Sequence, residues 1–352
     1  MMNTTMTFKC PCCGGYLEFD PSLQKFKCLY CGQVLSEDDL REQSEKRESA
    51  ADEVQEQAKA AGESLRTYQC QMCGAEIVTD ETTAGTRCYF CHSPVVLHDR
   101  LDDEFRPDGV IPFKLDKAAA EKQFLDYISR KKFVDRSFFN GAQLEMFSGV
   151  YYPWWYADIE GEGEFDGEGT RSSVSSTPTH IVTTTRVYNV HREGRLSFRQ
   201  LARKALLKAD GKLSDGIHPY DVSEIKPYAS GYLSGFLAEK RDVTEAAAKE
   251  EMIREAEAYA QSMMQENHGF NTLSGQARFK ALSAKMKYVL LPAWVLTYKG
   301  GKDGAPYYYM MNGQTGRVCG KLPIDKKRLL AAALGAGIDV FLLLGGGGAF
   351  IW

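Results

Sequence analysis

Four CxxC pairs in the first hundred residues constrain the fold of this chain more than any other feature. They fall into two sets, and in each set fourteen residues separate one pair from the next. Zinc prefers four soft ligands in a tetrahedron, and two CxxC turns joined by a hairpin supply four thiolates without leaving an open position. The sequence therefore predicts two structural zinc sites. The predicted ligands are Cys10, Cys13, Cys28 and Cys31 for one ion, and Cys70, Cys73, Cys88 and Cys91 for the other.

An internal repeat with an offset of 60 residues contains these cysteines. Residues 8–35 align with 68–95 without a gap, and Cys12, the extra thiol of the first copy, aligns with Met72. The repeat therefore excludes Cys12 from the predicted ligands. Each copy is too small to fold on apolar burial alone, so we expect metal binding to supply most of its folding free energy.

Cysteine usage and the N-terminus favour metal ligation over disulfides. Nine of the ten cysteines precede residue 92, and the first residues show neither a basic start nor an apolar stretch typical of a secretory signal. In a reducing cytosol, paired CxxC motifs indicate metal ligands. Two Zn²⁺ ions are the predicted cofactors, and an iron or iron–sulfur centre is the main alternative.

Composition gives little support to nucleic-acid binding. The formal net charge is −4, and residues 1–100 hold 16 Asp and Glu against 10 Lys and Arg. Binding to a phosphate backbone would therefore require a local basic patch on the protein, and the stretch from Arg199 to Lys212 is the one candidate. Its spacing favours a solvated helix face. The acidic run from Glu160 to Glu168 alternates with Gly and Phe, which favours the exposed face of a strand pair over a cation site.

The fold class that we expect is α+β: two small N-terminal four-cysteine zinc ribbons, a larger α+β body with antiparallel strands, and a C-terminal apolar helix. Hydrophobic periodicity and turn residues predict the elements of the body. The predicted segments are zinc ribbon 1 at 6–36, a charged helical or flexible linker at 37–67, zinc ribbon 2 at 68–100, the α+β domain at 104–325 and the C-terminal helix at 326–352.

Within the body we expect two helices and several strands. The helices are predicted at 117–131 and, behind a cap signal at Asp242, at 244–265. The strands are predicted at 108–115, from 149 onward with a polar turn, at 180–190, at 286–299, and as a hairpin at 305–322 that turns at Asn312 and Gly313. A weak second repeat relates 150–158 to 289–297, which indicates two related strands in one sheet or two half-domains.

The C-terminal segment is long and apolar enough to predict a transmembrane or membrane-associated helix. From Leu329 to Trp352 its 24 residues carry one charge, Asp339. A helix of that length reaches roughly 36 Å, against about 30 Å for a hydrocarbon core. Lys326, Lys327 and Arg328 precede it, which predicts a cytoplasmic body. The alternative is a buried or interfacial helix in a soluble cytoplasmic protein.

The chain also resembles a bacterial family of TFIIB-type double zinc-ribbon membrane proteins, common in Firmicutes. Besides the ribbons, the resemblance lies in PDGVIPFKLDK at 107–117, GVYYPWWYAD at 149–158, GYLSGFLAEKRDV at 231–243 and NGQTGRVCGKLP at 312–323. It implies the same eight cysteine ligands and a membrane location, with membrane-stress proteins among the partners. Members often carry the label replication-restart helicase, but this sequence has no GxxxxGK[ST] loop with which to bind ATP.

These observations lead to one leading hypothesis and two alternatives. The first is a non-enzymatic zinc-ribbon adaptor, tethered to the cytoplasmic face of the cell membrane and recruiting protein partners. The second is a nucleic-acid-binding zinc-ribbon protein linked to transcription or replication. The third, an enzyme working in the aromatic body near Trp154 and Trp155, has only an aromatic cluster in its favour, since the sequence shows no catalytic motif.

Overall fold

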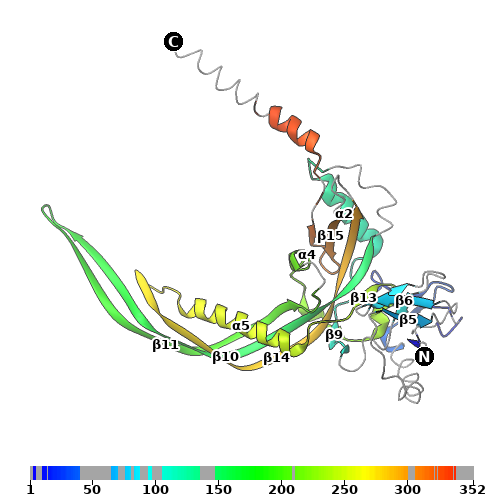
Figure 1. Cartoon of the computed structure of the whole chain (residues 1–352), viewed down its shortest axis with the longest axis horizontal. Helices are drawn as coiled ribbons and strands as arrows, with labels where there is room; N and C mark the ends of the chain where they lie inside the picture. The colour runs from blue at the N-terminus through cyan, green and yellow to red at the C-terminus, as the bar shows by residue number, and fades with distance from the viewer. Residues whose placement is uncertain are drawn as a thin grey trace, which may run out of the picture.

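The computed structural model describes residues 3–4, 10–13, 15–39, 65–69, 76–80, 83–87, 94–96, 105–134, 147–207, 211–299, 306–320, 322, 324–335 and 337. Within them the chain is mixed α+β and mostly sheet, and most strand pairs are antiparallel. This confirms the predicted fold class in its general form. A long curved arm extends from one end of the body, whereas the N-terminal strands lie at the opposite end (Figure 1).

Three long strands form the arm. They are β10 (Ser148–Ser176), β11 (Ile181–Lys204) and β14 (Thr272–Lys299). β10 is central and pairs antiparallel with both neighbours, from Trp154 to Ser176 with β11 and from Ser148 to Thr170 with β14. Helix α5 (Glu245–Met264) packs against one face of this sheet, which we call the inner face (Figure 1).

The arm forms because β10 alternates with a period of two over much of its length. Glu162 and Glu164 are exposed on the outer face, whereas Gly163 and Phe165 are buried on the inner face, where Gly163 approaches Met264 of α5. The predicted exposed acidic face is therefore confirmed. The polar turn that we expected within this stretch is wrong, because the strand continues to Ser176 and the chain reverses at 177–180.

The body sheet joins short strands from distant parts of the chain. Its order is β12-β9-β14-β10-β13-β7-β8, with β15 on β14 and β16 on β15. The short strands are β7 (Thr83–Arg87), β8 (Pro94–Val96), β9 (Gly109–Val110), β12 (Lys226–Pro227), β13 (Leu237–Glu239), β15 (Pro306–Asn312) and β16 (Val318–Gly320). The strand predicted at 108–115 is thus reduced to β9.

The weak second repeat corresponds to two neighbouring strands of one sheet. Pro153 in β10 pairs with Leu290 in β14, and Tyr151 pairs with Pro292. The sequence left two interpretations open, and the structure agrees with the first, two related strands in one sheet. In the same part of the sheet Gly149 pairs with Trp294, on which Phe147 stacks with ring centroids 5.5 Å apart.

Two predicted helices are confirmed with small changes at their ends. Helix α2 (Lys117–Ser129) begins after Asp116, whose carboxylate accepts a hydrogen bond from the Ala119 N–H at 2.7 Å. Helix α5 begins after Thr244, whose hydroxyl accepts from the Ala247 N–H. Asp242 is not the cap, because its carboxylate accepts from the Leu207 N–H. Further short helices are α4 (Gly211–Gly216), η5 (Val222–Glu224) and η6 (Ser230–Leu233).

Two local predictions were wrong. The basic stretch from Arg199 to Lys204 is the end of strand β11 rather than a helix. The hairpin of β15 and β16 has a loop at 313–317 instead of a two-residue turn, because the side-chain carbonyl of the buried Asn312 accepts from the N–H groups of Gln314 and Thr315 and holds a wider turn.

Residues 326–335 at the C-terminus are helical, and the side chains of Leu329, Leu330 and Leu334 are exposed. Among the residues that the structure describes, no helix is long and apolar enough to cross a membrane. Most of the predicted apolar segment, including Asp339, lies outside those residues.

Candidate metal centre

The first two CxxC pairs sit at the ends of a small antiparallel sheet. It consists of β2 (Leu17–Asp20), β3 (Lys25–Cys28) and β4 (Val34–Leu35). Asp20 shapes the turn between β2 and β3, because its carboxylate accepts from the N–H groups of Ser22 and Leu23. The hairpin therefore brings Cys28, at the end of β3, back beside the first CxxC turn.

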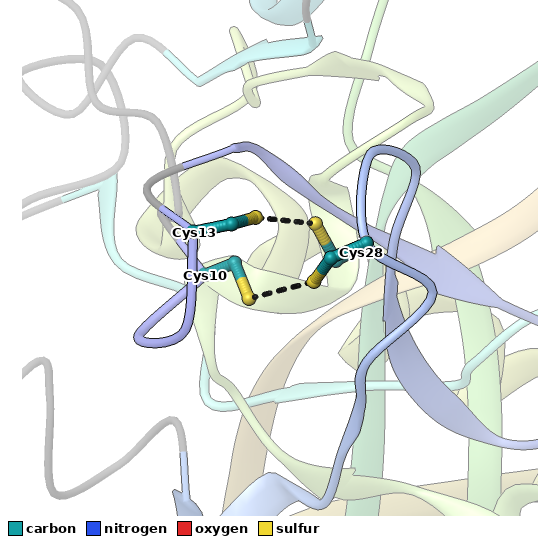
Figure 2. A group of neighbouring side chains, drawn as sticks. Cys10, Cys13 and Cys28 are labelled. Atoms are coloured by element: carbon teal, nitrogen blue, oxygen red, sulfur yellow. Dashed lines mark hydrogen bonds between the residues drawn. The ribbon is translucent and has the colours of Figure 1, made fainter.

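The four predicted ligands of the first site converge, and Figure 2 labels three of them, Cys10, Cys13 and Cys28. The Sγ atoms of Cys10 and Cys31 are 3.6 Å apart, and those of Cys13 and Cys28 are 3.5 Å apart. All four sulfurs lie within 4.8 Å of one another, and none of these cysteines forms a disulfide. Cys10 and Cys28 are buried, whereas Cys13 and Cys31 face solvent. The cluster can hold one metal ion.

Backbone N–H groups favour thiolates at two of these positions. Burial raises the pKa of Cys28, but hydrogen bonds from the N–H groups of Cys31 and Tyr30 and from neighbouring thiols bring it down to about 6. For Cys10, burial is likewise outweighed by hydrogen bonds from the N–H groups of Cys12 and Cys13, so its pKa is lowered. A metal ion binds thiolates, and these N–H groups would stabilise them.

The second set of ligands, Cys70, Cys73, Cys88 and Cys91, lies outside the described residues. Strands β5 (Leu65–Gln69) and β6 (Glu76–Asp80) lie on either side of its first CxxC pair in the sequence and pair antiparallel. Strand β1 (Asn3–Thr4) adds to β5 in parallel, so the N-terminus reaches the second cysteine region. β7 of the same region pairs with β13 and so belongs to the body sheet. The structure thus brings together the first predicted site and gives no geometry for the second.

The first cysteine region, residues 10–35, is joined to the body by hydrogen bonds that could not be predicted from the sequence. The Phe19 N–H donates to the Ser234 carbonyl at 3.1 Å, and the Ser234 hydroxyl donates to the Leu17 carbonyl. The Gln24 amide donates to the Phe113 carbonyl at 2.6 Å. These hydrogen bonds therefore join one small hairpin to the body at both Ser234 and Phe113.

Aromatic packing joins the sheet of β2, β3 and β4 to the core of the body. Phe19 and Phe26 are buried, and both contact Tyr232 of η6, with centroid distances of 5.1 and 5.7 Å. The Tyr232 hydroxyl donates to the Glu37 carboxylate at 2.6 Å. Gly235 has φ of +97°, and a side chain there would collide with Glu18. The close approach therefore depends on a residue that tolerates a left-handed backbone.

One further group of metal-ligating side chains lies on the arm. Glu164, Asp166 and His191 place ligand atoms within 4.8 Å of one another, and all three are exposed. The Arg278 guanidinium lies 3.5 Å from Asp166 and 3.9 Å from Glu164. A protein cation therefore already neutralises these carboxylates, which agrees with our interpretation of the acidic run as a solvated face.

The chain is similar over almost its whole length to a protein that is described as uncharacterized. The chain is 29% identical over 343 residues to the uncharacterized protein YdjG of Bacillus subtilis (strain 168), and the match covers 96% of each chain. The similarity therefore includes the arm and the body as well as the cysteine regions. No protein-family model matches the chain. No solved structure matches it either.

Proposed function

We propose that this protein is a non-enzymatic zinc-ribbon adaptor that recruits protein partners at the cytoplasmic face of a membrane. The observation that carries the proposal is the closed four-cysteine cluster, which is fastened to the body by Phe19, Gln24 and Ser234. Such a centre stabilises a rigid surface, and rigid surfaces suit recognition.

The sulfur geometry supports zinc as the metal. At a Zn–S distance of about 2.3 Å, the edges of a tetrahedron measure about 3.8 Å. The pairs Cys10–Cys31 and Cys13–Cys28 are separated by 3.6 and 3.5 Å, so the spacing of their sulfurs is close to that of a zinc site. Four thiolates fill the tetrahedron and leave no position for a substrate, which supports a structural role over catalysis.

Charge near the C-terminus supports the membrane part of the proposal. Lys326, Lys327 and Arg328 begin the C-terminal helical segment, and the exposed Leu329, Leu330 and Leu334 follow. Basic residues beside an apolar segment remain on the cytoplasmic side and are attracted to anionic lipid.

The decisive experiment compares the full chain with a chain that ends at Asp325. Both are fractionated by carbonate extraction, and the zinc content of each is measured after dialysis. We expect only the full chain to resist extraction, and both to hold about two zinc ions per chain, one for each four-cysteine set. Full extraction of both proteins, or a zinc content near zero, would contradict the proposal.

The nucleic-acid alternative is tested in parallel with a gel-shift assay at low salt, where phosphate contacts are strongest. The formal net charge of −4 supports the expectation that no shift occurs. A shift that weakens steeply with added salt would move the alternative ahead of the adaptor.

A further inference from the structure

Strand β11 forms one edge of the arm and is open to pairing. It pairs with β10 from Lys204 at the body to Ile181 near the tip, and no other strand in the described part of the chain pairs with it. In an antiparallel strand, alternate residues direct their N–H and C=O groups away from the neighbour. β11 therefore presents a long row of backbone donors and acceptors, which is the template for strand addition.

The three strands of the arm alternate in charge. β10 is acidic, whereas β11 and β14 are basic. The acidic residues of β10 are Asp158, Glu160, Glu162, Glu164, Asp166 and Glu168, against Arg171 alone. The basic residues of β11 are Arg186, Arg192, Arg195, Arg199, Arg203 and Lys204, against Glu193 alone. The basic residues of β14 are Arg278, Lys280, Lys285, Lys287 and Lys299, and it has no acidic residue.

Acidic side chains of β10 face basic side chains on the neighbouring strands. Glu162 of β10 stands opposite Arg195 of β11 and Lys280 of β14. The Arg199 guanidinium lies 3.9 Å from the Glu160 carboxylate. Opposite charges facing each other on neighbouring strands stabilise a sheet. The arm is therefore built as an acidic strand between two basic ones.

The same charges disfavour a second copy of this chain as the occupant of the edge. A fully overlapped antiparallel pair with another β11 would place Arg186 opposite Arg199, and like charges facing each other across strands destabilise the pair. The segment 272–287 of β14 is the other open edge in the described arm, and it is basic as well. The complementary neighbour for β11 is an acidic strand, as β10 already is on its other side.

We propose that the free edge of β11 binds an extended acidic segment of a partner protein by strand addition. Arg195, His191, Val187 and Ile181 share the outer face, because an even number of positions separates each from the next. Val187 and Ile181 are 62% and 75% exposed. The partner segment therefore carries carboxylates toward the body and apolar side chains toward the tip of the arm.

This inference rests on the adaptor role proposed above, because it names the chemistry of one partner. Its test reads peptide binding, whereas the adaptor test reads zinc content and membrane extraction. A failure of one is therefore distinguishable from a failure of the other.

The experiment titrates the full-length protein into fluorescein-labelled peptides and follows their anisotropy. The probe alternates Glu with Thr over about ten residues, the upper end of typical strand lengths. Its matched controls are a peptide that alternates Lys with Thr, and the Glu–Thr peptide with N-methyl groups on alternate amides. We expect saturable binding of the probe, no binding of the Lys–Thr peptide, and at least roughly tenfold weaker binding of the methylated one, because it cannot complete the ladder.

Protein variants locate the surface. Arg195→Glu combined with Arg199→Glu is expected to weaken probe binding roughly tenfold or more, because both side chains border the edge. Lys280→Glu combined with Lys285→Glu on β14 makes the same change of charge and is expected to leave binding within about twofold. Circular dichroism checks that both variants are folded.

Four outcomes would overturn the proposal. They are absence of probe binding at low salt, equal binding of the methylated peptide, equal weakening by the β14 variant, and displacement of the probe by a single-stranded oligonucleotide. The second would reduce the interaction to charge alone, and the last would assign the edge to nucleic acid.

Discussion

At the level of single residues, the outer face of the arm contains an ion pair in which the pKa of one member is raised and the pKa of the other is lowered. His191 Nδ1 lies 2.7 Å from an Asp166 carboxylate oxygen. The hydrogen bond to Asp166 raises the pKa of His191, and the charges of Asp166, Glu193 and Glu164 add to it against an opposing effect of burial. The hydrogen bond from His191 lowers the pKa of Asp166, aided by Arg278.

The sign of the pH dependence follows from these two directions. A raised histidine pKa contributes stability that is present below its unfolded value of 6.5 and is lost as pH rises through the folded value. A lowered aspartate pKa contributes stability that is present above its unfolded value of 3.8 and is lost as pH falls through the folded value. The pair therefore stabilises the arm in mildly acidic solution.

We predict that replacing Asp166 returns the pKa of His191 toward its ordinary value. An NMR titration of the His191 ring, in the protein and in Asp166→Asn, measures this directly. Glu193→Gln is the control and is expected to shift the pKa less, because Glu193 lies 3.8 Å from the ring, on its other nitrogen. An unchanged titration in Asp166→Asn would show that the contact does not persist in solution.

At the scale of elements, the arm depends on glycines where its strands and α5 approach closely. A side chain at Gly167 of β10 would collide with the Ser274 carbonyl and approach Gly275 Cα within 2.8 Å. Gly194 of β11 is in open space, because no atom lies within 4 Å of the point that an alanine Cβ would occupy. The two glycines therefore differ in what they contribute to the same sheet.

We predict opposite consequences for alanine at these two positions. Gly167→Ala is expected to lower the free energy of unfolding by roughly 1–3 kcal/mol, because the backbones of β10 and β14 must separate. Gly194→Ala is expected to be neutral or slightly stabilising, because glycine weakens a strand interior. Urea unfolding of both variants makes the comparison. Equal effects would mean that glycine acts here only through chain flexibility.

At the scale of the whole molecule, the first cysteine region and the body share one hydrophobic core. Leu17, Phe19 and Phe26 belong to the same buried cluster as Tyr232 and Phe236. Folding of a cysteine ribbon depends on its metal. Metal binding to the cysteine cluster would therefore be coupled to the packing of the body through these side chains.

We predict that removing the metal lowers the melting temperature of the body as well as unfolding the ribbon. A loss of about 1 kcal/mol shifts Tm by roughly 2–4 °C in a protein of about 150–250 residues, so a chelator is expected to shift the β-sheet melting curve by several degrees. Cys28→Ser should reproduce this shift, whereas Cys12→Ser, beside the cluster but outside it, should not. A chelated protein whose sheet melts unchanged would contradict the coupling.

Much of the secondary structure could be predicted from local sequence patterns. The helices at 117–129 and 245–264 follow from their periodicity and their caps, which are properties of neighbouring residues. The polar turn predicted after 149 was wrong because glycine-rich polar stretches also mark turns, and only the long period-two alternation distinguishes a strand. The helix predicted over the basic residues 199–204 was wrong because four-residue spacing occurs by chance in short segments.

The α+β class and the four-cysteine cluster of the first site could be predicted from sequence patterns alone, because CxxC spacing fixes which sulfurs a hairpin brings together. The packing of this hairpin on the body and the position of β11 at an open edge depend on the three-dimensional fold. These contacts join residues far apart in the chain, such as Leu17 and Ser234, whose separation is 217 positions. No local pattern records such a pairing, since it depends on the shape of the complete core.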